Sequence, residues 1–124
     1  MAMVEMIFVL PLLILLVFAI AEFGLMFSRW LTLSNAVREG ARVGVVFRAP
    51  CNPGPVETEV RNAVVSYARA GGIPLQTSAV NVSGACSGTN QPLTVASSYP
   101  FPLNIPFARL APVNLSYSSQ MRNE

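Results

Sequence analysis

Hydrophobic residues dominate the first quarter of the chain. From Met6 to Ser28 there are 23 residues with a single charge, Glu22, which is long enough to span a hydrocarbon layer of about 30 Å. The sequence continues past Ser28 without a Gly-Pro break. The pattern therefore predicts one helix from about Met3 to Phe47, roughly 65 to 70 Å long at 1.5 Å per residue.

A second helix and a sheet are predicted after the breaker PCNPGP at residues 50–55. Apolar positions at helical spacing continue to Gly71 and Gly72, which end the helix. Its predicted core stripe is Val56, Val60, Ala63, Val64, Tyr67 and Ala68. Apolar and polar residues then alternate, which predicts three antiparallel strands. The inward positions are Val80 and Val82, then Leu93, Val95 and Tyr99, then Val113, Leu115, Tyr117 and Met121.

The predicted fold class is therefore α+β, with a long N-terminal helix and a small C-terminal domain of one helix and a three-stranded antiparallel sheet. We expect the long helix in residues 1–49 and the domain in residues 50–124. The segment 98–112, between the last two strands, is rich in proline and aromatic residues. It is expected to be a packed surface loop or a subunit contact.

Two features of the long helix predict local behaviour. Pro11 lacks an amide proton, so we expect a kink or a short unwound stretch near Phe8 to Pro11. Ala36, Gly40 and Gly44 recur at four-residue intervals, which places three small residues on one face where another backbone can approach closely. That backbone belongs either to another subunit or to the chain's own domain, and we favour the latter because the domain must pack somewhere.

The two cysteines, Cys51 and Cys86, both follow the apolar segment. We expect a disulfide, which would close a loop of about 36 residues and stabilise the small domain by roughly 3.5 to 4 kcal/mol. A disulfide implies an oxidising compartment, the periplasm or the cell exterior. The alternative is a pair of free buried thiols in a reducing compartment.

Charge and composition exclude several functional classes. The net charge is +2, and the eight basic residues, all arginine, are scattered rather than clustered, so no nucleic-acid binding is expected. The chain has no His, Asp or Lys, and two cysteines alone cannot form a structural zinc site. We expect neither an enzyme nor a cofactor, since the residues for a catalytic or metal site are missing.

Two carboxylates accompany the apolar segment: Glu5 just before it and Glu22 inside it. A carboxylate at membrane depth costs about 2.5 to 3.5 kcal/mol unless it is neutralised. For Glu5, the free α-amino group of a neighbouring copy is one candidate, since staggered parallel helices could bring the two together. The alternative is that Glu5 lies among lipid headgroups.

Orientation in the membrane gives conflicting signals. Every arginine follows the span, so the positive-inside rule would place the domain in the cytoplasm, whereas a disulfide requires an oxidising compartment. A basic leader removed ahead of Met1 resolves the conflict, and we expect Met1 to be a processed N-terminus. A cleaved secretory signal within this sequence is disfavoured, because the first five residues hold no Arg or Lys and the apolar run is too long.

Three stretches carry a resemblance to a known family: AMVEMIFVLPLLILLVFAIAEFG, LTLSNAVREGARVGVV and the ending SQMRNE. The features shared in order and register are Glu5, Pro11, Glu22-Phe23-Gly24, Asn35-Ala36 and Glu39-Gly40-Ala41-Arg42. The chain resembles the TadE-like pilins of tight-adherence (Tad) pilus systems, within the type IV filament superfamily. Met1 and Met6 depart from the family, in which pilins commonly begin with Phe and TadE-like sequences commonly have Phe after the Glu.

The resemblance implies a structural pilin subunit that polymerises through its N-terminal helix into an extracellular pilus used for surface adherence. Its implied partners are further copies, other pilins, a prepilin peptidase and an ATP-driven assembly machine. The helix would span the inner membrane before assembly and form the filament core afterwards, with Glu5 and Glu22 neutralised between subunits. The alternative function is a single-pass membrane-anchored extracytoplasmic accessory or sensor domain that does not polymerise.

Overall fold

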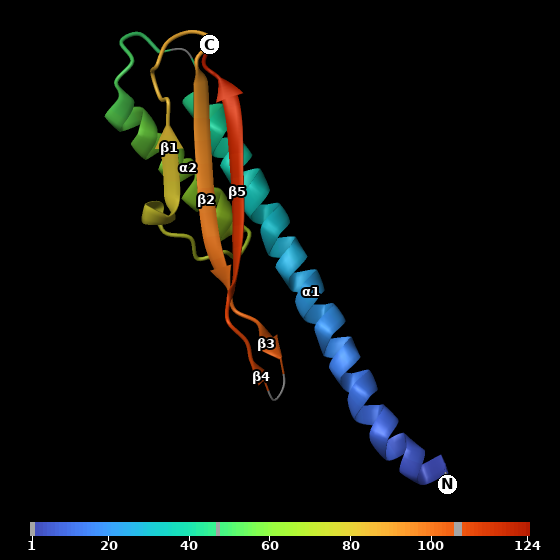
Figure 1. The fold of residues 1–124 in the computed structure, drawn as a ribbon. Helices are drawn as coiled ribbons and strands as arrows, with labels where there is room; N and C mark the ends of the chain where they lie inside the picture. The colour runs from blue at the N-terminus through green and yellow to red at the C-terminus, as the bar shows by residue number, and fades with distance from the viewer. Residues whose placement is uncertain (1, 47, 106–107) are drawn as a thin grey trace.

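The long helix, α1, runs from Ala2 to Gly44 in the computed structural model, which describes residues 2–46, 48–105 and 108–124. Its 43 residues correspond to about 65 Å. The first half projects away from the rest of the molecule, and the second half packs inside the domain (Figure 1). The helix ends at Gly44 rather than near Phe47, which lies outside the described residues.

The helix is continuous through Pro11, so the short unwound stretch that was one of the two expectations near Phe8 to Pro11 is not present. A proline removes one amide donor from the helical ladder, and the neighbouring turns keep their own hydrogen bonds. Pro11 and its neighbours are also exposed, which leaves room for the ring beside the helix.

The domain contains a second helix and a small sheet, as predicted. Helix α2 spans Pro53–Ala70, and a short 3-10 turn, η1, spans Thr77–Ala79. The antiparallel sheet has the strand order β1-β2-β5. Its strands are β1 (Val80–Ser83), β2 (Pro92–Phe101) and β5 (Val113–Arg122). The α+β fold class is therefore confirmed.

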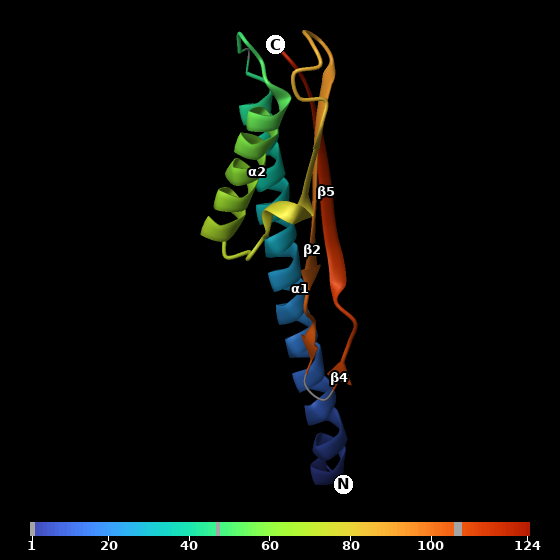
Figure 2. The same ribbon diagram turned by 90° about the vertical axis from the view of Figure 1, so that its left-hand side faces the viewer.

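The two helices lie together on one face of the sheet, and the other face is open to solvent (Figure 2). Alternation along β2 explains this arrangement, because Leu93, Val95 and Ser97 are buried while the residues between them are more exposed. The fully buried large side chains of the core are Leu33, Val37, Val60, Val64, Ile73, Leu75, Val80, Leu93 and Val95. Two of these side chains, Leu33 and Val37, belong to α1. The second half of α1 is therefore part of the same hydrophobic core as residues 50–124, across the boundary expected at residue 49.

The buried face of α2 differs in two positions from the predicted stripe. Val56, Val60, Val64 and Ala68 are buried as predicted, but Tyr67 is 44% exposed. Ala63 is only half-buried. Val65 is buried instead, because α2 packs against β1 as well as against α1 and so needs a wider apolar face.

The segment predicted as a surface loop contains a small ribbon of its own. β2 extends to Phe101, and two short strands, β3 (Asn104–Ile105) and β4 (Ala108–Arg109), pair antiparallel before β5 begins. The ribbon descends beside α1, below the main sheet (Figure 1), and β3 contacts the helix. Prolines around it prevent longer pairing, because each removes an amide donor.

Candidate functional site

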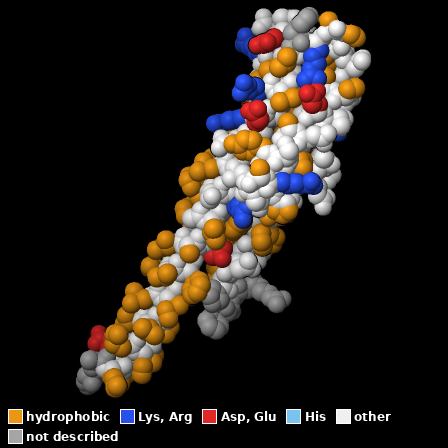
Figure 3. Space-filling model, turned by 180° about the vertical axis from the view of Figure 1, so that it is seen from behind, with side chains coloured by type: hydrophobic (Ala, Val, Ile, Leu, Met, Phe, Trp, Pro, Cys, Tyr) orange, Lys and Arg blue, Asp and Glu red, His pale blue; other side chains and the backbone are white. Residues whose placement is uncertain are grey.

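The projecting half of α1 presents a continuous apolar surface. Every residue from Met3 to Ala21 is exposed, and large side chains such as Phe8, at 76%, have little contact with the rest of the chain. Figure 3 shows these hydrophobic side chains covering the helix beyond the domain. Single exposed apolar residues are ordinary on protein surfaces, whereas a patch of this extent marks a membrane or protein contact.

By length and composition, α1 can cross a membrane. Its most apolar 18-residue window has a mean hydropathy of 2.8, and none of that window is buried in the fold. This part of the helix therefore differs from the core helix of a globular protein, whose apolar residues are covered by other elements. The apolar half of α1 suits a bilayer or a bundle of like helices.

The two carboxylates lie at opposite ends of this apolar surface. Glu5 is exposed and Glu22 is half-buried, and the 17-residue separation places them about 25 Å apart along the helix axis. None of the ion pairs among the described side chains includes either of them. Because of the distance between them, no single side chain can neutralise both.

The junction between the apolar surface and the domain is held by polar and aromatic contacts. Arg29 donates hydrogen bonds to the carbonyl oxygens of Gly71, at 3.1 Å, and of Gly72, just beyond the end of α2. Trp30 meets Tyr117 of β5 edge to face, with ring centroids 6.1 Å apart. The projecting helix is therefore fixed to the domain through both α2 and β5.

Tyr117 extends this junction along α1. Its hydroxyl accepts a hydrogen bond from Nε of Arg38 at 2.9 Å, and the same guanidinium lies 5.4 Å from the centre of its ring. A guanidinium over an aromatic face is attracted by the ring quadrupole. These partners of Arg29 and Arg38 are not predictable from local patterns, because they are 42 and 79 positions away.

The small residues of α1 pack against the chain's own domain. Ala36, Gly40 and Gly44 are all buried. A Cβ atom added at Gly40 would lie 2.2 Å from a methyl group of Val64, and one added at Gly44 would lie 2.5 Å from Leu93. The close approach is to α2 and β2, so these positions seat the domain on its helix.

Gly40→Ala is expected to lower the free energy of unfolding by about 2 to 3 kcal/mol, the cost of overpacking a core. The added methyl group meets Val64 at 2.2 Å and the carbonyl oxygen of Val60 at 3.3 Å, and a buried valine has no alternative rotamer that clears the space easily. Urea unfolding of the full chain in detergent, followed by the fluorescence of Trp30, measures the change.

Gly24→Ala is the matched control, because it makes the same substitution in the same helix with nothing within 4 Å of the added atom. It should leave the unfolding midpoint unchanged or raise it slightly, since alanine favours a helix more than glycine does. Equal midpoints for the Gly40 variant and the unsubstituted chain would contradict the close packing described above.

At its far end the domain is closed by a disulfide between Cys51 and Cys86, which confirms the predicted crosslink. Cys51 precedes α2, and Cys86 lies in the turn between β1 and β2. The C-terminus joins the same region, because Asn123 donates from Nδ2 to the Gly84 carbonyl oxygen at 2.9 Å and the Glu124 amide donates to Val45 at 3.1 Å.

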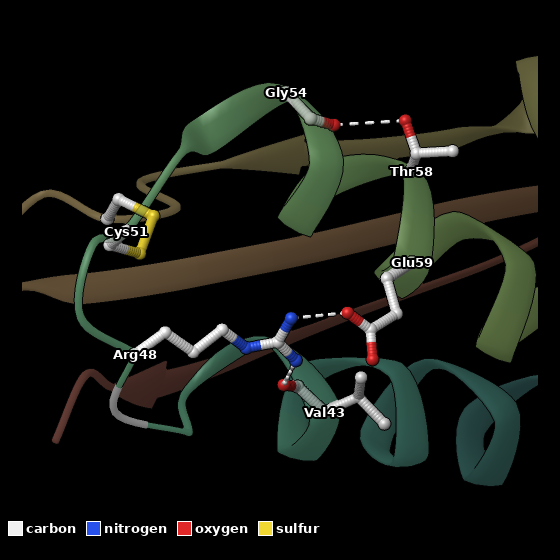
Figure 4. Close-up of polar contacts among 7 residues, drawn as sticks. Val43, Arg48, Cys51, Gly54, Thr58 and Glu59 are labelled. Atoms are coloured by element: carbon white, nitrogen blue, oxygen red, sulfur yellow. Dashed lines mark hydrogen bonds and ion pairs between the residues drawn. A yellow bond between two sulfur atoms is a disulfide. The ribbon is translucent and has the colours of Figure 1, made fainter.

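An ion pair lies beside the disulfide (Figure 4). Arg48 donates to the carboxylate of Glu59 on α2 and, at 3.4 Å, to the carbonyl oxygen of Val43 on α1. The hydrogen bond from Arg48 holds the pKa of Glu59 below its usual value, and it raises the pKa of Arg48. Because solvent reaches both side chains, the pair contributes little to stability. Its geometry ties the segment after α1 to the start of α2.

Comparison with known proteins supports the resemblance noted in the sequence. A family model described as TadE-like protein matches residues 1–42. Searches of curated proteins and of solved structures find no match. The matched segment is nearly the whole of α1, and it includes the apolar surface, both carboxylates and the first two of the small packing residues. The chain is therefore similar to TadE-like proteins over its N-terminal apolar helix.

Proposed function

We propose that this chain is a structural pilin subunit that polymerises through α1 into an extracellular, Tad-like type IV pilus used for surface adherence. The observation that carries the proposal is the division of one 43-residue helix into two halves. The second half is locked into a disulfide-closed domain, while the first half exposes apolar side chains and Glu5. The match to TadE-like proteins covers this helix.

The energetics of assembly follow from the composition of the exposed half. Transfer from lipid to a bundle of like helices changes the surroundings of its apolar side chains little, so burial from water is not the driving force. Close packing between helices and neutralisation of buried carboxylates remain as favourable terms. A lone membrane anchor would have no use for carboxylates at both ends of its span, whereas a subunit can neutralise them against its neighbours.

Partners and location follow from the same proposal. The chain is held by α1 in the inner membrane before assembly, with its domain on the oxidising side, where the Cys51–Cys86 disulfide persists. A prepilin peptidase removes a leader ahead of Met1, which lies outside the described residues. The assembly machine then moves the helix from lipid into the filament, which contains further copies and other pilins.

The competing function is a single-pass anchored accessory or sensor domain that does not polymerise. In that case the apolar half of α1 stays in lipid, and Glu5 lies among headgroups at the membrane surface. Both functions need the same helix and the same disulfide. The two differ in whether the chain leaves the membrane.

Mass spectrometry of filaments sheared from the cell surface tests the proposal. We expect this chain among the filament proteins, with Met1 at its processed N-terminus and the Cys51–Cys86 disulfide intact. The control is a strain that lacks the assembly ATPase. In that strain the chain should stay in the membrane fraction and should be absent from the sheared material. A chain found only in membranes of assembly-competent cells would support the anchored accessory domain instead.

A further inference from the structure

The outer edge of β5 has no partner strand in the part of the chain that the structure describes. β5 is the last strand of the sheet order β1-β2-β5, and its ten residues pair with β2 on one side only. Among the described residues, the backbone of β5 makes no hydrogen bond outside the sheet, and such bonds occur only after the strand, at Asn123 and Glu124. The other edge of the sheet, β1, is also without a further strand.

Edge strands of monomeric proteins are normally protected against pairing by charges, prolines, bulges, short length or a covering helix or loop. Along its central part β5 shows none of the first four devices. The polar and aromatic contacts described above between α1 and β5 go to Tyr117, on the inner face of the strand. β5 carries one charge, Arg122 at its end, and no proline. Ten consecutive one-to-one pairs with β2 leave no bulge. A long, regular and uncharged edge of this kind is a template for the addition of another strand.

Side-chain alternation at both edges is compatible with one continuous sheet. On β5, Ser116 and Ser118 are exposed on the outer face, while Leu115 is buried on the inner face. On β1, Asn81 is exposed on the outer face and Val80 is buried on the inner face. Neither edge carries like charges that would repel, so a neighbouring copy could continue the sheet with its polar face outward.

Strand directions decide which edges can meet. Since β1 and β5 are each antiparallel to β2, they run parallel to each other, and the strands lie roughly along α1 (Figures 1 and 2). Copies anchored in one membrane have parallel α1 helices, so two β5 strands could not meet antiparallel. Pairing β5 of one copy with β1 of the next keeps every helix parallel, and such a head-to-tail contact propagates rather than closing as a dimer.

We propose that β5 pairs in parallel with β1 of a second copy, so that the sheets of neighbouring subunits join along the outside of the filament. This inference rests on the proposed polymerisation and adds a contact outside α1. It assigns a role to the domain: α1 holds subunits together in the core, and the sheet edges set their relative rotation.

Coexpression of two single-cysteine variants tests the contact. One chain carries Asn81→Cys on β1, and the other carries Ser116→Cys, Ser118→Cys or Gln120→Cys on the outer face of β5. Because the two introduced cysteines are on different chains, a disulfide between them reports a contact between subunits. The native cysteines are already paired in their own disulfide. Oxidation of sheared filaments should give a disulfide-linked dimer at one of the three β5 positions, because the side chains of adjacent strands on one face are neighbours.

Ser119→Cys is the matched control, because it lies on the same strand but faces inward. Its dimer yield with Asn81→Cys should be lower by about tenfold or more, since a shift of one residue moves the side chain to the opposite face.

Filaments that contain this chain but give no β1–β5 dimer would overturn the sheet contact and leave polymerisation intact. Dimers between two β5 variants, or with a different protein, would also overturn it, and absence of the chain from wild-type filaments would overturn the proposed function itself.

Discussion

Removing the disulfide by the double substitution Cys51→Ser and Cys86→Ser is expected to lower the free energy of unfolding of the domain by about 4 kcal/mol. The crosslink joins residues 35 apart in sequence, and closing a loop of that length restricts the unfolded chain by this amount on the chain-entropy model. For a small domain, whose total stability is about 5 to 10 kcal/mol, such a loss removes roughly half of the stability, and at the lower end of that range it leaves a substantial unfolded fraction at 37 °C. Urea unfolding of the full chain in detergent, followed by Trp30 fluorescence, measures the loss.

The control for this prediction uses the reducing agent rather than another mutation. Wild-type protein unfolded in the presence of dithiothreitol should resemble the double variant, and the variant itself should not respond to dithiothreitol. If the wild-type midpoint proved independent of reduction, the disulfide would not contribute to stability in the way proposed. In cells, we expect the variant to be present in the membrane at a lower level, because proteases remove unfolded domains.

The disulfide supports a domain whose core is divided between distant segments. Leu33 and Val37 come from α1, Val60 and Val64 from α2, and Leu93 from β2. The crosslink ties the segment between the two helices to the turn between β1 and β2. It therefore holds together the end of the domain farthest from the projecting half of α1, where α1 has already ended.

Much of this fold is predictable from local patterns, because its elements are long and regular. The long apolar run predicts α1, apolar residues at helical spacing predict α2, and alternation of apolar and polar residues predicts β1, β2 and β5. The boundaries are less predictable: α1 was expected to continue to Phe47, but it ends at Gly44, where the chain must turn toward α2. The apolar character of Val45 and Val46 gave no sign of this, since propensity yields to packing at the ends of elements.

Positions that depend on distant partners were the least predictable. The pattern placed Tyr67 in the core, but α2 packs against two elements at once, which buries Val65 and exposes Tyr67. The role of Arg29 depends on the carbonyl groups that follow α2, more than 40 residues away. One signal was present in the sequence, because the adjacent Gly71 and Gly72 end a helix and leave carbonyl groups for a donor to satisfy.

The small residues of α1 show how a pattern can predict close approach without naming the partner. Spacing of four predicted a close approach at Ala36, Gly40 and Gly44. Of these, Gly40 is approached by α2, including the Val60 carbonyl oxygen, and Gly44 by side chains of β2 and α2. Glu5 and Glu22 are a different case, because a single chain does not contain the neighbours proposed for them.

Glu5→Ala is expected to leave membrane insertion intact and to abolish or strongly reduce filament formation. In the membrane, Glu5 lies at the start of the apolar span, where headgroups and water can solvate it, so its removal does not oppose insertion. In a filament core the proposed partner is the α-amino group of a neighbouring Met1. Removing one member of a buried ion pair costs about 3 to 5 kcal/mol, because the remaining charge is left without compensation.

A loss of about 3 kcal/mol at each subunit contact corresponds to roughly a 100-fold weaker association, which the yield of sheared filaments should reveal directly. Glu39→Ala is the matched control: Glu39 lies on the same helix, but within the domain, where its contact with Arg42 is long, at 3.9 Å, and solvent-exposed. It should assemble as the wild type does. Glu5→Gln separates charge from shape, since it keeps the size of the side chain, and it should fail as Glu5→Ala does. Wild-type filament yield from either Glu5 variant, with equal amounts in the membrane, would show that this carboxylate is not neutralised by a neighbouring subunit.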